Sequence, residues 1–160
     1  MSGARTAVRD AMAIPAAAIG PEVGLREAAA RLLEAPARTL AVVDAGGHLV
    51  GVLSEADLVV KVERPPPPAA AGSYAGRVER RRWSGAVAGD LMSRPPVTVG
   101  PDAGLADAAR LMRRHGLRCL PVVDGAGRPI GTVSRGDLLR MFLEDDETVR
   151  RERDRRGGWR

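Results

Sequence analysis

Apolar and polar positions along this chain form the same series of patterns twice, on either side of a proline-rich stretch. Apolar residues spaced i, i+3, i+4 and i+7 predict a helix with one buried face. That spacing occurs at two sets of residues: Leu25, Ala28, Ala29 and Leu32, and Leu105, Ala108, Ala109 and Met112. Pro36 and Gly116 predict the ends of these helices, because proline cannot continue a helix and glycine favours the left-handed turn that closes one.

Short runs rich in Val and Leu predict strands around each helix. In the second half of the chain they are residues 97–99, 120–123 and 129–133, and the turn Asp124-Gly125-Ala126-Gly127 joins the last two into a hairpin. The first half repeats the hairpin at residues 40–43 and 49–53, whereas Ala16-Ala17-Ala18 predicts a weak first strand.

A further helix is predicted after each hairpin. The first begins after Ser54 and ends before Pro65, and the second begins after Ser134 and can continue past Phe142. Beyond it, opposite charges spaced i, i+4 predict a solvated helix that Gly157-Gly158 would end. These pairs are Asp146/Arg150, Glu147/Arg151 and Glu152/Arg156.

The two halves match residue by residue. Residues 8–60 align with residues 88–140 without a gap, which indicates tandem duplication of a β-α-β-β-α unit. One such unit leaves an apolar sheet face open, so we expect the two to pack together in an α/β (α+β) fold. The predicted divisions are unit 1 (1–63), a Pro/Ala/Gly- and Arg-rich linker (64–85), unit 2 (86–143) and a charged tail (144–160).

Each copy contains Ser-x-x-Asp where its last strand runs into its last helix: Ser54 and Asp57, and Ser134 and Asp137. This is a capping-box pattern, in which the hydroxyl caps the first turn and the carboxylate reaches back, and it needs no ligand. The same groups suit a nucleotide, because a carboxylate accepts hydrogen bonds from ribose hydroxyls and a helix N-terminus favours phosphate. Both interpretations remain open at this point.

The duplicated unit resembles the CBS domain, and the pair of units looks like a Bateman module. The resemblance rests on Asp-x-Met near the start, Leu120-Pro121-Val122-Val123-Asp124 in the middle, and Gly131-x-Val133-Ser134-x-x-Asp137 at the end. It implies two units packed around a pseudo-twofold axis with two clefts between them. It also implies a regulatory adenine ligand such as AMP, ADP, ATP or S-adenosylmethionine, with Ser contacting phosphate and Asp contacting ribose.

Basic residues near these motifs are candidate phosphate contacts. The resemblance implies this role for Arg38 and Arg118, which precede the middle strands. Arg135, inside the second Ser-x-x-Asp, favours phosphate, whereas its counterpart Glu55 would repel it. Together with Ala41 in place of the expected proline, this makes the cleft at Ser134 and Asp137 the better candidate.

Other chemistry is not predicted. His48 and His115 lack a second ligand at metal spacing, Cys119 opens an apolar strand as a small core residue, and no catalytic triad or Walker loop is present. The single cysteine and the absence of a long apolar run or signal-like N-terminus lead us to expect a soluble cytoplasmic protein that does not enter a membrane. We expect no enzyme activity, no metal and no required cofactor.

The sequence therefore predicts a non-enzymatic sensor of an adenine ligand that forms a homodimer and regulates an unidentified effector protein. One alternative is a ligand-free dimeric scaffold whose Ser-x-x-Asp motifs only cap helices. The net charge of +5, concentrated in residues 61–87, leaves a second alternative, nucleic-acid binding through Arg80-Arg81-Arg82-Trp83. Because a solvated linker explains that cluster equally simply, nucleic acid is the least favoured partner.

Overall fold

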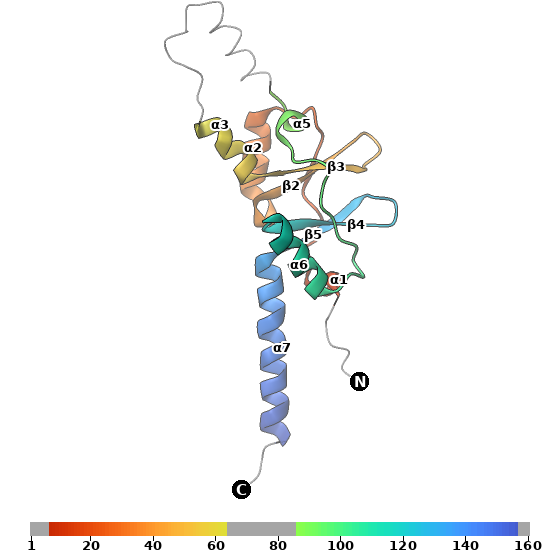
Figure 1. Ribbon diagram of the computed structural model, residues 1–160, viewed down its shortest axis with the longest axis vertical. Helices are drawn as coiled ribbons and strands as arrows, with labels where there is room; N and C mark the ends of the chain where they lie inside the picture. Colours follow the sequence, from red (N-terminus) through yellow and green to blue (C-terminus); the bar gives the residue numbers. More distant parts are fainter. Residues whose placement is uncertain (1–6, 64–85, 157–160) are drawn as a thin grey trace, which may run out of the picture.

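The computed structural model describes residues 7–63 and 86–156. The predicted linker at 64–85, with its arginine cluster, and Gly157-Gly158 lie outside the described residues. Unit 1 contains α1 (Val8–Ala11), β1 (Ala18–Ile19), α2 (Leu25–Glu34), the 3-10 turn η1 (Pro36–Arg38), β2 (Thr39–Val43), β3 (Leu49–Ser54) and α3 (Glu55–Glu63). Unit 2 contains α5 (Ala88–Leu91), α6 (Leu105–His115), β4 (Cys119–Val123), β5 (Pro129–Ser134) and α7 (Arg135–Arg156) (Figure 1).

Both predicted hairpins and all four predicted helices are confirmed. Strands β2 and β3 pair antiparallel, as do β4 and β5, with Val42 opposite Gly51 and Val122 opposite Gly131. Helix α2 ends before Pro36, and α6 ends at Gly116, whose φ of 65° is the left-handed value that glycine adopts without a steric penalty. The two ends therefore differ as the sequence predicts.

The first strand is short in both units. In unit 1 it is the two-residue β1, weak as expected, which pairs parallel with β2, whereas in unit 2 the predicted strand at 97–99 is reduced to a single bridge between Val99 and Val122. In unit 1 the Ala41 amide donates to the Ala17 carbonyl at 2.8 Å. Pro121 occupies the equivalent position in unit 2 and has no N–H to donate, so the ladder stops short there.

The first helical turn of each unit packs on the other unit. Val8 in α1 is fully buried in the unit 2 core, and Ala88 in α5 is fully buried in the unit 1 core. In this exchange, the start of each unit also forms isolated β-bridges with the other unit, at equivalent positions. Ala7 bridges to Gly104 as Val87 does to Gly24, and Ala13 bridges to Thr132 as Ser93 does to Val52. Such reciprocal contacts are those of a twofold relation, so the expected pseudo-twofold packing is confirmed.

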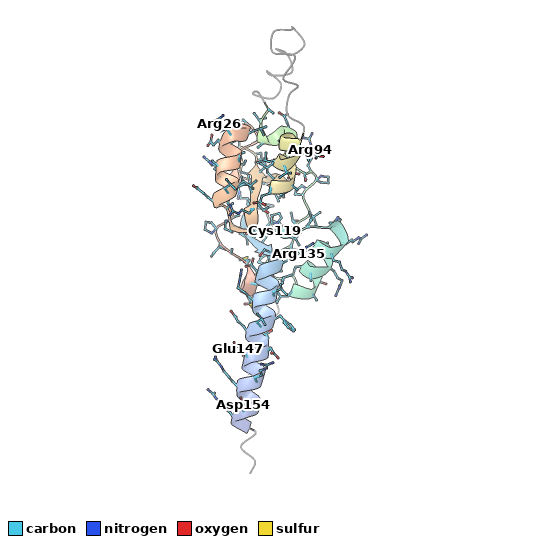
Figure 2. The ribbon with its side chains drawn as sticks, turned by 90° about the vertical axis from the view of Figure 1, so that its left-hand side faces the viewer. Arg26, Arg94, Cys119, Arg135, Glu147 and Asp154 are labelled. Carbon is cyan, nitrogen blue, oxygen red and sulfur yellow. The ribbon has the colours of Figure 1, made fainter. Side chains whose placement is uncertain are left out.

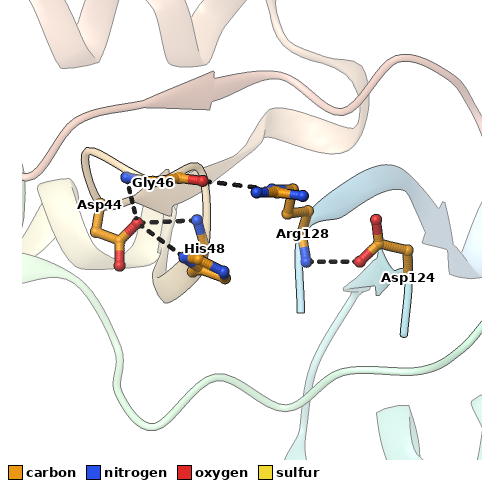
Figure 3. Close-up of polar contacts among 5 residues, drawn as sticks. All are labelled: Asp44, Gly46, His48, Asp124 and Arg128. Carbon is orange, nitrogen blue, oxygen red and sulfur yellow. Dashed lines mark hydrogen bonds and ion pairs between the residues drawn. The ribbon is translucent and has the colours of Figure 1, made fainter. Parts of the chain in front are cut away.

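The two hairpin turns also meet (Figure 3). In each turn a carboxylate accepts hydrogen bonds from two backbone amides: Asp44 Oδ1 from Gly46 and His48, and its counterpart Asp124 in the same way. These bonds, above all the one from the His48 amide, hold the pKa of Asp44 below its ordinary value. Arg128 Nε donates to the Gly46 carbonyl at 3.3 Å and links the turns.

Helix α7 continues without a break from unit 2 into the predicted tail. It is 22 residues long, and its second half extends away from the rest of the molecule, as Glu147 and Asp154 show in Figure 2. Two of the predicted i, i+4 pairs form, Asp146–Arg150 at 3.2 Å and Glu147–Arg151 at 3.5 Å. The Arg156 side chain, which belongs to the third pair, lies outside the described residues.

Candidate functional site

Both Ser-x-x-Asp motifs cap the helices that follow them. Asp57 Oδ2 accepts the Ser54 amide at 2.8 Å and the Ser54 hydroxyl at 3.1 Å. Asp137 Oδ2 accepts the Ser134 amide and hydroxyl, both at 2.8 Å, and the Ser134 hydroxyl in turn accepts the Asp137 amide at 3.2 Å. The capping interpretation is therefore correct for both motifs, whatever else they do.

Each cap uses only one carboxylate oxygen, and the second oxygens have different partners. Asp57 Oδ1 accepts the hydroxyl of Ser93 from the start of unit 2 at 3.2 Å, an exposed bond. Asp137 Oδ1 is paired with the guanidinium of Arg140, one turn further along α7. Capping therefore leaves Asp57 an oxygen that only a neutral hydroxyl contacts, whereas the equivalent oxygen of Asp137 is in an ion pair.

A cavity of about 580 Å³ lies between the units beside the first of these motifs. Its size falls in the range of small-molecule sites, about 300 to 1,000 Å³. Unit 1 contributes the start of β2, the end of β3 and the first turns of α3, and unit 2 contributes the segments before and within β4. The lining includes Ala37, Arg38, Thr39, Val52, Ser54, Glu55, Asp57, Ser93, Pro95, Pro96, Val97, Leu117, Arg118, Cys119 and Pro121.

The two arginines that line the cavity differ in whether their side chains already have polar partners. Arg38 Nε pairs with Glu55 Oε1 at 3.6 Å, and its NH1 donates to the Leu33 carbonyl. Ala37 and Arg38 have φ values of 54° and 51°, in the left-handed region that non-glycine residues rarely adopt, so the backbone is strained at this wall of the cavity. The Arg118 side chain makes no ion pair or hydrogen bond with any residue in 7–63 or 86–156.

The structure thus brings together four of the seven candidate residues and separates three. Ser54, Asp57, Arg38 and Arg118 line one cavity, to which Ser134, Asp137 and Arg135 do not contribute. Arg135 lies at the head of α7 (Figure 2), where its amide donates to the Arg118 carbonyl at 2.9 Å and its Nε to the Leu117 carbonyl at 3.1 Å. Arg135 therefore supports the backbone that presents Arg118.

Sequence reasoning missed Ser93 and the prolines that follow it. They lie at the start of unit 2, and no local pattern marks them as part of a site built on the end of β3. The exchange between units places them there, through the backbone bridge of Ser93 with Val52. A twofold contact pattern predicted from the duplication would have been the only sequence-level signal.

Cys119 is both a core residue, as expected, and part of the cavity wall. It is 6% exposed, and Figure 2 shows it near the middle of the molecule, where the units meet. Burial raises the pKa of its thiol to about 11. The thiol is therefore protonated at neutral pH and is a poor nucleophile.

The described residues contain neither a group of side chains suited to a metal ion nor a helix suited to cross a membrane. Within 7–63 and 86–156, no three His, Cys, Asp or Glu side chains are grouped in a way that could hold a metal ion. None of the helices in those two ranges is both long enough and apolar enough to cross a membrane.

A duplicated α+β unit with exchanged first turns and a cleft between its halves defines a tandem-domain fold. The sequence model of the CBS domain matches residues 8–64 and 88–144, and the chain belongs to this family as a tandem pair.

Relatives and solved structures agree with this assignment. The chain is 36% identical over 105 residues to MJ1404 of Methanocaldococcus jannaschii, and 31% identical over 148 residues to the chloroplastic CBS domain-containing protein CBSX2 of Arabidopsis thaliana. Those alignments cover 66% and 79% of this chain but only 24% and 58% of the two relatives.

Two of the solved structures that are similar to this chain are complexes with a nucleotide. A crystal structure of CBSX2 in complex with AMP superposes with a TM-score of 0.72 at 31% identity, covering 88% of this chain and 98% of that one. The cytosolic domain of the Mg²⁺ channel MgtE in complex with ATP superposes with a TM-score of 0.62 at 26% identity, covering 84% of this chain and 48% of that one.

Proposed function

We propose that the protein is a non-enzymatic regulatory module that binds an adenine nucleotide or adenosyl ligand in the cavity between its CBS units. The observation that carries the proposal is the meeting, across one cavity, of Asp57, with an oxygen outside its cap, and Arg118, whose side chain has no polar partner among the described residues. The AMP complex of the similar CBSX2 supports an adenine ligand. AMP, ADP, ATP and S-adenosylmethionine are the candidates.

Each part of the ligand has a matching group. Asp57 Oδ1 would accept ribose hydroxyls in place of, or together with, the Ser93 hydroxyl. Arg118 would pair with phosphate, and Ser54 lies at the N-terminus of α3, which favours an anion. The apolar side chains of Val52, Pro96 and Val97 offer a surface for the adenine ring.

This choice of cleft differs from the preference drawn from the sequence. Pro121, which the motif comparison counted in favour of the cleft at Ser134 and Asp137, lines the cavity beside Ser54 and Asp57 instead, together with Arg118. Asp137 is also paired with Arg140. We therefore propose the cleft at Ser54 and Asp57 as the principal site, and ligand binding at Ser134, Asp137 and Arg135 stays an untested prediction.

Regulation would follow from the position of the cavity between units. A ligand that contacts Asp57 in unit 1 and Arg118 in unit 2 favours whichever packing of the units it fits best, and it shifts the population only by that difference in affinity. An effector protein would respond to the shift. The exposed apolar residues of α3 and α7, among them Val59, Leu139 and Phe142, are the proposed homodimer surface in a cytoplasmic protein.

The test is thermal unfolding with AMP, ADP, ATP and S-adenosylmethionine. A ligand present at about 100 times its dissociation constant adds about 2.7 kcal/mol to the free energy of unfolding, which raises the melting temperature by several degrees. If none of the four ligands moves the transition, the sensor hypothesis is wrong for them. The alternative of a ligand-free dimeric scaffold then becomes the better explanation.

A further inference from the structure

Four charged side chains of the described residues line the cavity, and they are unequally available to a ligand. Arg38, Glu55 and Asp57 come from unit 1, and Arg118 comes from unit 2. Their formal charges cancel. A ligand with several phosphates would therefore enter a cavity with no net positive charge, so the arrangement of the individual groups decides which anion fits.

Glu55 makes the cavity less favourable for a second anion in two ways. Its carboxylate pairs with Arg38 at 3.6 Å, and Arg38 also donates to the Leu33 carbonyl, so this guanidinium is already engaged. The same carboxylate lies on the cavity wall with its side chain 49% exposed, where it repels any second anion. Of the arginines in the described part of the chain that line the cavity, only Arg118 remains to pair with phosphate.

The candidate ligands differ in how much negative charge they bring. AMP carries a single phosphate, which one arginine can bind through two parallel hydrogen bonds. The further phosphates of ADP and ATP would lie beyond that arginine, in a cavity whose wall includes Glu55. Glu55 is half exposed, so its surroundings are close to water, where the repulsion between two charges about 4 Å apart is about 1 kcal/mol, or about five- to tenfold in affinity.

We propose that Glu55 is a specificity-determining residue that excludes nucleoside di- and triphosphates, so that the site takes an adenosine ligand with at most one phosphate. This inference rests on the proposed function and deepens it. The two Ser-x-x-Asp motifs differ in charge at this position, since Arg135 is the counterpart of Glu55. At this position, only the unit 1 motif therefore carries a carboxylate that can select against phosphate.

The test measures dissociation constants of adenosine, AMP and ATP by titration calorimetry, at fixed ionic strength and with EDTA so that no metal neutralises the ATP. The wild-type chain, Glu55→Gln and Glu63→Gln are compared. Glu63 is an exposed residue of the same helix that does not line the cavity, so its variant makes the same change in net charge. The double variant Glu55→Gln/Arg38→Gln separates lost repulsion from release of Arg38.

We expect wild type to bind AMP at least about fivefold more tightly than ATP, and Glu55→Gln to reduce that ratio by about five- to tenfold, mainly through tighter ATP binding. Adenosine affinity stays the same, and Glu63→Gln behaves as wild type. AMP binding with an unchanged ratio in Glu55→Gln, or equal AMP and ATP affinity in wild type, overturns this inference alone. No binding of any of the three to wild type or Glu55→Gln overturns this inference, and if S-adenosylmethionine and ADP also leave the melting temperature unchanged, the proposed function falls with it.

Discussion

Met92, at the end of α5, lies directly against Gly51 in the middle of β3. The duplicated residues Met12 and Gly131 meet in the same way on the other unit, where the Ala13 carbonyl oxygen would lie 2.6 Å from a β-carbon at position 131. The glycine of each final strand is therefore required because a segment of the other unit crosses it. The backbone bridges of Ala13 with Thr132 and of Ser93 with Val52 join the two units beside these glycines.

Adding a methyl group at these glycines should destabilise the fold. Gly131→Ala would press on a backbone carbonyl that cannot move independently, so we expect a loss of about 2 to 3 kcal/mol in the free energy of unfolding. Gly51→Ala meets the flexible side chain of Met92 and should cost about 1 kcal/mol. Urea unfolding measures both. Gly125→Ala, with open space around the new methyl, is the control, and equal losses at 125 and 131 would contradict the contact.

The two capping carboxylates allow a matched test of the proposed cleft. Asp57→Ala and Asp137→Ala each remove the same capping bonds and should each cost about 0.5 to 2 kcal/mol in stability. Only Asp57→Ala should also abolish most of the ligand-induced rise in melting temperature, because Asp57 lines the cavity. A larger loss of that rise in Asp137→Ala would instead support the preference drawn from the sequence.

The strained wall of the cavity gives a prediction of increased stability. Ala37 has φ 54° and ψ 19°, a conformation that costs an L-residue about 1 to 2 kcal/mol and glycine almost nothing. Part of this gain is offset by the greater freedom of glycine in the unfolded chain, about 0.4 to 1 kcal/mol. We expect Ala37→Gly to stabilise the protein by up to about 1 kcal/mol in thermal unfolding.

Ala45→Gly is the control for that variant. Ala45 is exposed in a turn, and it is not among the residues with a positive φ. It should therefore lose a few tenths of a kcal/mol or more, because only the unfolded chain gains freedom. If both variants lose stability alike, the strain at Ala37 does not contribute.

Cys119 can report on the cavity through its reactivity. With a pKa of about 11, only about one thiol in a thousand is ionised at pH 8, whereas an ordinary cysteine is ionised roughly a hundred times more often. Iodoacetamide should therefore label the native protein about a hundredfold more slowly than the unfolded chain, and the rate should rise with pH toward 11. Added AMP should slow labelling further, and rapid labelling at pH 8 that AMP does not affect would show that this thiol is not enclosed.

Features that depend on residues close together in the chain could be predicted from the sequence, and features that depend on distant residues could not. The helix faces at 25–32 and 105–112, the two hairpins and the cap formed by Ser54 and Asp57 follow from spacing over a few residues, so they could be predicted. The prediction of a strand at 97–99 overestimated its length. The hydrogen-bonded ladder there depends on whether residue 121, more than twenty positions away, has an N–H. The alanine-rich first unit nevertheless forms the two-residue strand β1, because Ala41 has an N–H that donates to the Ala17 carbonyl.

The sequence by itself determined that the chain contains a duplicated α+β unit of the CBS type and named the residue types able to hold a nucleotide. Only the tertiary structure decided which of them share a cavity. The exchange of first turns brings Ser93 to Asp57 and sets Arg118 of one unit opposite Ser54 of the other. Within unit 1, the pairing of Thr39 with Ser54 places Glu55 beside Arg38. The contacts between the units join segments far apart in the chain and are fixed by packing two cores together, and no periodicity within either unit encodes them.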